Sequence, residues 1–394
     1  MGKCLFCDAD LSPGSEEHVF LSALGGRLVT SKATCGVCNN DFANDITGKL
    51  DDAFAENFVH VRNALRIWSG RNKPPPTINR DGKLSGGIEY DLAPGMVPVV
   101  RKAQLPDTSL LLEGTSHRVV ARDIEDSKRV LKILSKRDIN VKVSGALRVQ
   151  EKAPQTEFNI SIHGPTTFRA AAKAAVLSVC VLYGNEQTHE EIDSDLFSAI
   201  KNGHPDICLY AGWEYTNCWP IIKDVAPHKR TPSAHLSGFE HSVMITDVND
   251  GWIAYVEFFG GFRFSIRLGA SSGLPNRGLS VNPRSSKPER FVILAEPPAK
   301  YCSKNQESYK TEFDFVSNGY NNAFDRVLNQ WQQESRKDYF QKLSQELLTQ
   351  IATAHSEETR ISIIRDWAGK VAALEMGNSW AEDMDLSFNE DDDG

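Results

Sequence analysis

The chain has 394 residues, of which 40% are hydrophobic and 24% are charged, and its formal net charge is −8. This composition is ordinary for a soluble globular protein, and the length is sufficient for two or three domains. No apolar run approaches the roughly 20 residues of a membrane span, so we expect no membrane partner.

Four cysteines near the N-terminus form two C-x2-C pairs, Cys4 with Cys7 and Cys35 with Cys38, which are separated by 27 residues. Each pair can present two thiolates to one metal ion, and two pairs supply the four soft ligands of a closed tetrahedral zinc site. A closed site of four thiolates has no position for water, so the predicted zinc is structural. Disulfide bonds between the same cysteines are the alternative, but no signal peptide precedes Cys4, and reduced cytoplasmic thiols favour zinc.

Polar residues suited to catalysis lie between the two cysteine pairs and directly after the second pair. Glu17 and His18 lie between the pairs, and Asn39 and Asn40 follow the second one. A neutral imidazole with a pKa of about 6.5 can take a proton from water near neutral pH. A carboxylate and an amide oxygen are hard ligands suited to Mg²⁺ or Mn²⁺. Any chemistry of this segment must therefore come from these four residues rather than from the zinc.

Residues 4–42 also carry a recognisable order of motifs: C-x2-C, then Glu-His-Val, then a double glycine, then C-x2-C-Asn-Asn-x-Phe. This order resembles the zinc-containing HNH endonucleases, whose site is a ββα-metal hairpin and helix. The resemblance implies a nuclease that cuts DNA. It assigns His18 as the general base, Glu17 as one ligand of a catalytic Mg²⁺ or Mn²⁺ ion, and Asn39 as the second ligand, with Asn40 in reserve.

Two other functions remain open at this stage. The N-terminal segment could be a non-catalytic zinc knuckle that binds nucleic acid or a partner protein. Alternatively, the nuclease could be gated by a ligand or partner that the region after residue 78 senses. The chain has no phosphate-binding loop of the P-loop type, so an ATPase partner would have to be another chain. A restriction or anti-phage role is the biological setting that we expect by analogy.

The first long periodic segment follows the second cysteine pair. Apolar residues recur at helical spacing over 41–70, which predicts one long helix with at most one break. Arg62, Arg66, Arg71 and Lys73 follow on its C-terminal half, where they either contact a DNA backbone or favour the negative end of the helix dipole. Three prolines at 74–76 cannot continue a helix, so we assign residues 1–71 to the nuclease module.

Residues 78–300 are expected to form a mixed α+β domain of unknown role, either for DNA specificity or as a sensor. In its first half the sequence predicts strands at 87–92, 97–102, 118–122 and 139–143 and a helix over 123–137. That helix carries Lys128, Arg129 and Lys132 on a basic side opposite its apolar residues. The basic side is either a solvated face or a face that contacts phosphates.

The second half of this region is predicted to combine an alanine-rich core helix with several strands. The helix is expected over 166–183, after a strand at 157–163, and a second helix over 193–201. Strands are expected at 207–211 and 241–246, followed by a hairpin of 252–259 and 262–268 around a double glycine.

The C-terminal part is predicted to be helical over 307–380, as a cap or an oligomerisation element, and it permits a homo-oligomer. The final segment, 381–394, has seven acids and no base, so the rest of the chain carries a net charge of about −1. We expect this tail to be disordered, either as a solvating appendage or as a mimic of DNA. The predicted fold class is therefore α+β, with an N-terminal ββα-metal module, a mixed middle region and C-terminal helices.

Overall fold

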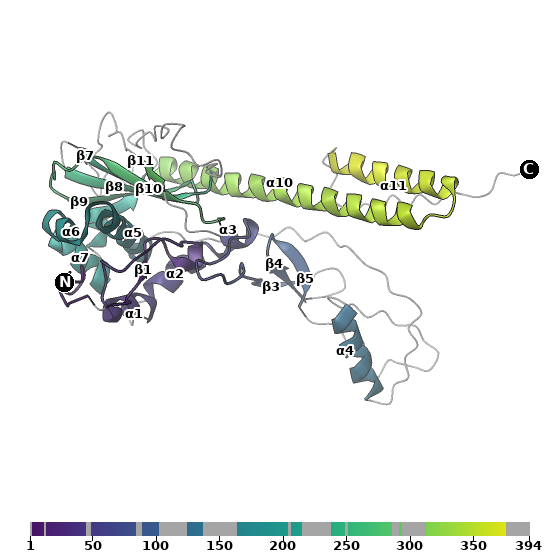
Figure 1. Cartoon of the computed structure of the whole chain (residues 1–394), viewed down its shortest axis with the longest axis horizontal. Helices are drawn as coiled ribbons and strands as arrows, with labels where there is room; N and C mark the ends of the chain where they lie inside the picture. The colour runs from purple at the N-terminus through teal and green to yellow at the C-terminus, as the bar shows by residue number, and fades with distance from the viewer. Residues whose placement is uncertain are drawn as a thin grey trace, which may run out of the picture. The chain divides into compact units, whose positions relative to one another are not determined.

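The computed structural model describes most of the chain, with gaps between the described segments. These are residues 2–11, 13–44, 49–83, 89–101, 124–136, 164–203, 206–214, 238–248, 251–285, 291–293 and 313–375. The fold is a mixed α+β fold with C-terminal helices, as the sequence predicts, and it divides into two compact units (Figure 1). The first unit combines residues 1–76 with 159–328, and the second combines 77–158 with 329–394. The predicted acidic tail lies outside the described residues.

The N-terminal module, residues 2–73, has the order of a ββα unit. Strand β1 (Glu17–His18) pairs antiparallel with β2 (Val29–Thr30), with the short 3₁₀ helix η1 (Ser22–Leu24) between them. Helix α1 (Gly36–Asn44) follows. The two-residue strands are held by Val19, whose N–H donates to the Leu28 carbonyl at 2.9 Å.

The prediction of one long helix over 41–70 with at most one break is wrong. The structure has three shorter helices there, α1, α2 (Leu50–Asn57) and α3 (Val59–Ala64). Lys49 adopts a left-handed conformation with φ of 48° immediately before α2, and Phe58 leaves helical geometry with φ of −107° between α2 and α3. The apolar spacing survives these breaks because each helix still turns its apolar residues toward the same core.

A six-stranded antiparallel sheet forms the body of the first unit. Its strands, in spatial order, are β11 (Phe291–Ile293), β10 (Arg277–Val281), β7 (His241–Val248), β8 (Gly251–Phe258), β9 (Phe262–Gly269) and β6 (Ala211–Trp213). The predicted strand at 241–246 and the predicted hairpin are confirmed as β7, β8 and β9. The predicted strand at 207–211 is wrong, because 207–210 form the short helix α8 (Ile207–Tyr210) before β6 begins. A short apolar run does not distinguish strand from helix by periodicity.

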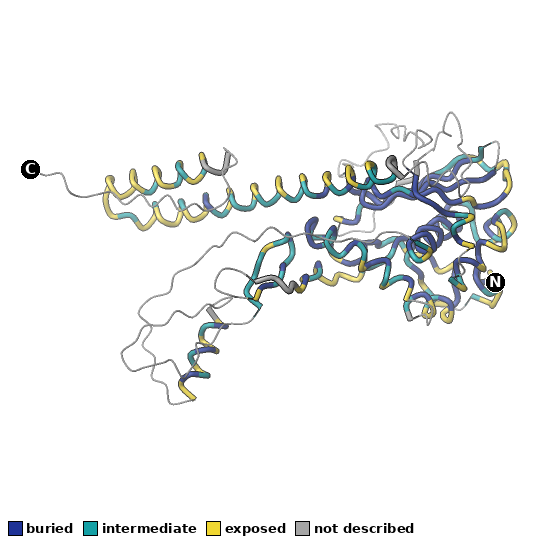
Figure 2. The backbone as a smooth tube through the Cα atoms, turned by 180° about the vertical axis from the view of Figure 1, so that it is seen from behind, coloured by how far each residue is buried: buried dark blue, intermediate teal, exposed yellow. Residues whose placement is uncertain are grey.

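Helix α5 (Pro165–Tyr183) is the core helix of the first unit, and α6 (Asn185–Glu191) and α7 (Ser194–Asn202) follow it. Pro165 starts α5 at a position where its missing N–H costs nothing. Contrary to the sequence expectation, α5 is long and apolar enough to cross a membrane by length and composition. However, 83% of its apolar window is buried inside the protein, which is typical of a core helix (Figure 2).

Aromatic side chains attach the N-terminal module to the sheet. Phe54 and Phe58 from α2 and its end contact Phe258 and Phe262, with ring centroids 5.0 Å apart in each pair and edge-to-face geometry. Phe20, which follows β1, meets Phe258 at 5.9 Å. Such pairs contribute about 0.5–1.5 kcal/mol each beyond the area that they bury. The module and the sheet therefore share one core.

The second unit contains a three-stranded antiparallel sheet and the remaining helices. Its strands are β3 (Ile78–Lys83), β4 (Glu89–Ala93) and β5 (Val97–Val100). Its helices are α4 (Ile124–Ser135), the part of α10 (Phe313–Thr353) from residue 329 onward, and α11 (Glu357–Glu375). Within this unit the Trp331 indole donates a 2.7 Å hydrogen bond to the Gly95 carbonyl. The strands predicted at 118–122, 139–143 and 157–163 lie outside the described residues.

His241 is a fully buried histidine at the contact between the sheet and the N-terminal module. Its Nε2 donates to the Leu24 carbonyl at 2.9 Å, and its Nδ1 accepts from the Phe259 N–H at 3.2 Å. These two bonds fix the neutral tautomer. Burial lowers the pKa of His241 to about 4, although the bond to Leu24 raises it in part.

The folded protein should therefore lose stability on acidification through His241. In the unfolded chain the imidazole takes up a proton as the pH falls through about 6.5, whereas the folded protein resists this until about pH 4. We expect the free energy of unfolding to fall by about 3 kcal/mol between these pH values because of this residue. Urea unfolding of wild type, His241→Gln and the control His355→Gln at several pH values checks this. If the free energy of unfolding of His241→Gln falls with pH as steeply as that of wild type, the assignment is contradicted.

Candidate active site in the N-terminal module

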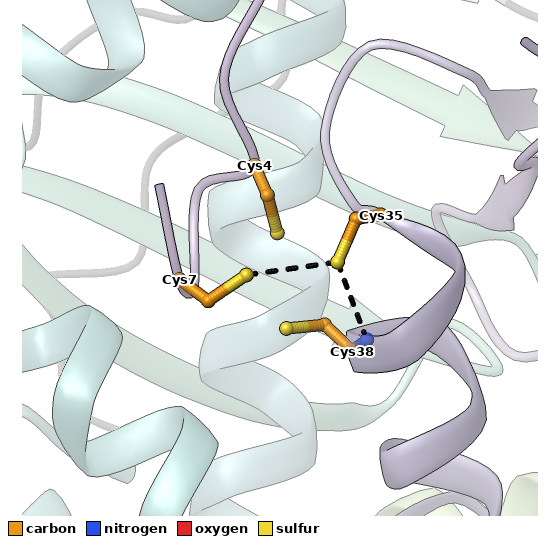
Figure 3. A group of neighbouring side chains, drawn as sticks. All are labelled: Cys4, Cys7, Cys35 and Cys38. Carbon is orange, nitrogen blue, oxygen red and sulfur yellow. Dashed lines mark hydrogen bonds between the residues drawn. The ribbon is translucent and has the colours of Figure 1, made fainter. Parts of the chain in front are cut away.

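The side chains of four cysteines in the N-terminal module point toward one another (Figure 3). The Sγ atoms of Cys4, Cys7, Cys35 and Cys38 all lie within 4.8 Å of one another. Those of Cys7 and Cys35 are 3.6 Å apart, far longer than the roughly 2.05 Å of a disulfide, and the Cys38 N–H donates to the Cys35 Sγ at 3.5 Å. The chain brings the cysteines together because one pair lies in the N-terminal turn and the other at the start of α1.

The donor set of this cluster fits zinc. Four thiols and no oxygen ligand make a soft, closed set, and Zn²⁺ binds such sets tetrahedrally at about 2.3 Å from each sulfur. Among the described residues, this is the one group of three or more His, Cys, Asp and Glu side chains that could hold a metal ion. A zinc ion there would join the first turn of the chain to α1 and would leave no ligand position for catalysis.

A buried lysine from α5 lies beside the first strand of the module. The Lys173 Nζ is 2.7 Å from Oε1 of Glu17 and 2.9 Å from Oδ1 of Asp51, which is on α2. The lysine side chain is 2% exposed, that of Glu17 4%, and that of Asp51 21%. Nζ also lies 4.3 Å from the centre of the Phe42 ring on α1. One cation thus contacts β1, α1 and α2 together.

The electrostatics of this triad favour an ionised lysine. Burial alone would lower the pKa of Lys173, but the carboxylates of Asp51 and Glu17 outweigh it and raise the pKa above its usual value. Burial raises the pKa of Glu17, and the charge of Lys173 opposes that rise. The pKa of Glu17 stays above its ordinary value, and Lys173 is the cation that favours its ionised form in this buried environment.

His18 follows Glu17 on β1 and is partly buried. Burial is the main cause that lowers the pKa of His18 below its ordinary value, and the positive charge of Arg71 lowers it further. The Gly26 backbone raises it, although Nδ1 has no hydrogen bond of normal geometry among the described residues. The imidazole is therefore neutral at neutral pH, which is the state that a general base requires.

Asn39 and Asn40 lie in α1, and Asn39 is held against β1. Its Nδ2 donates to the Glu16 carbonyl at 2.8 Å, so the side chain lies beside the peptide group that precedes Glu17. Asn39 therefore lies beside the backbone that leads into Glu17 and His18, and we call this end of the hairpin the His18 corner. Asn40 is exposed on the next position of α1.

The five basic residues predicted to contact nucleic acid are distributed over both units. Arg62 and Arg66 are half-buried, and burial lowers the pKa of Arg62. Lys128, Arg129 and Lys132 are exposed on α4. Lys128 pairs with Glu125 at 2.7 Å, and Arg129 pairs with Asp126 at 2.8 Å.

Sequence reasoning missed Lys173 and Asp51 as neighbours of this corner, and it named Arg71 as a possible contact of a DNA backbone without placing it near His18. A single lysine in an alanine-rich apolar helix was the available indication for Lys173, because a buried lysine needs an acidic partner. Neither Asp51 nor Arg71 carries such an indication, since only the fold brings them near Glu17 and His18.

Comparison with known proteins gives a match for the N-terminal segment of the chain. Residues 4–58 match the family model described as HNH endonuclease. This segment is an HNH endonuclease domain. The match confirms the predicted resemblance, and it is restricted to the N-terminal part of the chain. No curated protein and no solved structure matches the chain.

The HNH endonuclease domain indicates a nuclease, and this family typically uses a divalent metal ion. The matched segment contains the four cysteines, Glu17, His18 and Asn39, together with Asp51. It does not contain Lys173 or Arg71. The HNH domain therefore depends on residues outside the matched segment for part of its electrostatic environment.

The cysteine cluster predicts about one zinc ion per chain in the purified protein, since four thiolates complete the coordination of one ion. Cys38→Ser should lose the zinc and unfold the HNH domain. The control Cys208→Ser changes a half-buried thiol on α8 and should retain the metal. Elemental analysis and circular dichroism check both variants, and retention of zinc in Cys38→Ser would contradict the assignment.

Removal of the buried ammonium should destabilise the first unit. Lys173→Met leaves Glu17 and Asp51 without their cation, and breaking a buried ion pair in this way costs about 3–5 kcal/mol. The control is Lys3→Met, which removes an exposed pair with Asp10 and should change the stability little. Chemical unfolding of the zinc-loaded proteins measures both effects. Equal stability of Lys173→Met and wild type would exclude the ammonium as the required counter-charge.

Proposed function

We propose that the HNH domain hydrolyses phosphodiester bonds of DNA, with His18 as the general base. The supporting observations are that the imidazole of His18, which follows Glu17 on β1, is neutral and partly buried, and that Asn39 is hydrogen-bonded to the backbone directly before these two residues. His18 takes a proton from water as the water oxygen bonds to phosphorus. The ester P–O bond breaks, and the leaving oxygen takes a proton from solvent.

Glu17 and Asn39, with Asn40 in reserve, would hold the divalent ion in this proposal. A carboxylate and amide oxygens fit Mg²⁺ or Mn²⁺ chemically, and Asn39 uses its Nδ2 for Glu16, which leaves its Oδ1 as the ligand atom. When bound, such an ion stabilises negative charge on the phosphate and the leaving oxygen. Lys173 favours the ionised form of Glu17 and fixes it in place.

The test is a cleavage assay on supercoiled plasmid with Mg²⁺, Mn²⁺ or EDTA. We expect metal-dependent nicking or linearisation by wild type. His18→Ala should reduce it at least about 100-fold because it removes the base, while zinc content and folding stay unchanged. The control His355→Ala, in an exposed position, should cleave as wild type does.

Three results of this assay would favour a different role for His18 or for the whole domain. Cleavage that persists in His18→Ala would contradict the role of this base. Zinc-loaded protein that binds DNA but never cuts it would favour the non-catalytic zinc knuckle, whereas cutting that begins after addition of infected-cell extract would favour a gated nuclease.

A restriction or anti-phage role is part of this proposal only by analogy with nuclease domains that are joined to larger unfamiliar bodies. Phage DNA with and without modified bases, offered beside plasmid DNA, tests that role. A clear preference for phage DNA supports it, and equal cutting of all substrates argues against it.

A further inference from the structure

A compact loop, residues 69–73, follows α3 and lies outside the segment that matches the HNH family. We call it the Arg71 loop. The Ser69 N–H donates to the Lys73 carbonyl at 2.9 Å, and the Lys73 N–H donates to the Ser69 hydroxyl at 2.9 Å. Asn72 closes the turn with a third bond of 2.9 Å, to the Ser69 carbonyl. These bonds within the loop fix the backbone on either side of Arg71.

The Arg71 loop is docked on the double-glycine turn that follows β1. The Gly70 N–H donates to the Ser22 carbonyl at 2.7 Å. A Cβ atom at Gly70 would lie 1.9 Å from the Gly26 carbonyl oxygen, so only glycine permits this contact. The Arg27 side chain stabilises this contact, since it donates hydrogen bonds to the Gly70 carbonyl at 3.1 Å and to the Asn72 side chain at 2.8 Å.

This docking places Arg71 directly after Gly70, which packs against the Gly26 carbonyl in the turn between β1 and β2. The charge of Arg71 acts on both His18 and Glu17. Its side chain is exposed and makes no hydrogen bond or ion pair with any other described residue. The other arginines nearby are less available: Arg62 is half-buried, and Arg27 is engaged with Gly70, Asn72 and the Ser285 carbonyl.

We propose that Arg71 binds the scissile phosphate of the substrate and is a catalytic residue of the HNH site. This inference rests on the proposed nuclease function. A guanidinium can donate two parallel hydrogen bonds to the non-bridging oxygens of a phosphate. As the water oxygen approaches phosphorus, negative charge grows on those oxygens, and a cation carried by a well-fixed backbone would stabilise that charge.

The first experiment measures single-turnover cleavage of a duplex by full-length, zinc-loaded protein in Mg²⁺. Arg71→Ala should lower the rate about 100-fold or more, the scale of losing one transition-state donor. Arg71→Lys should recover part of the rate, because it restores the charge but not the paired donors. The matched control is Lys73→Ala, which removes an equal charge from the same loop and should stay within about threefold of wild type. A rate for Arg71→Ala as high as that of Lys73→Ala would overturn the proposal.

The second experiment does not require cleavage and so separates the two proposals. The dinucleotide pTpT is titrated into the zinc-loaded protein without added Mg²⁺ or Mn²⁺ while the His18 ring resonance is followed by NMR, with His18→Ala used to assign it. We expect a shift in wild type and Lys73→Ala that is lost in Arg71→Ala. An equal shift in Arg71→Ala, or no shift in wild type, would overturn the role of Arg71. A shift that depends on Arg71 in a protein that never cuts DNA would support phosphate binding and count against the nuclease.

Discussion

The HNH domain depends on the buried ion pairs that the ammonium group of Lys173 makes with Glu17 and Asp51. This ammonium group contacts a carboxylate on β1, a carboxylate on α2 and an aromatic ring on α1, so three elements of the N-terminal module meet at one buried charge. Removing such a charge from water is costly, and the cost is offset only when the partners are close and correctly placed. The positions of Glu17 and Asp51 are therefore coupled. Because Lys173 belongs to α5, the geometry of the domain also depends on the body of the first unit.

Several further contacts of the module hold the His18 corner in position. The cysteine cluster joins the first turn of the chain to α1, and Asn39 joins α1 to the peptide before Glu17. Phe20, Phe54 and Phe58 anchor the outer side of the module to the sheet. His241 holds the end of η1 through Leu24. Each contact involves a different pair of elements, which is why a hairpin with two-residue strands can be held in place at all.

The parts of this fold that the sequence predicts are those that local spacing determines. The two C-x2-C pairs, the Glu17-His18 pair and the double glycine between β8 and β9 each predict their local structure from a few consecutive residues. The helix predicted over 41–70 was wrong because apolar spacing is preserved across Lys49 and Phe58, where the backbone leaves helical geometry. Lys173 could not be placed at the site because Glu17 and Asp51 are more than 120 residues away in sequence. Arg71 could not be placed there because its position depends on the contact between Gly70 and the Gly26 carbonyl. Long-range packing, rather than propensity, decides these positions.

The first unit is built from two separated segments of the chain, 1–76 and 159–328, and this division has a consequence for synthesis. The HNH segment ends at residue 58, whereas its buried cation is at residue 173. At the ribosomal rate of about 5–20 residues per second, the carboxylate of Glu17 waits on the order of ten seconds for its counter-charge. The strands that bear Phe258 and Phe262 emerge later still. A nascent chain therefore carries an unfinished HNH domain until Phe262 has been synthesised, about two thirds of the way along the 394 residues.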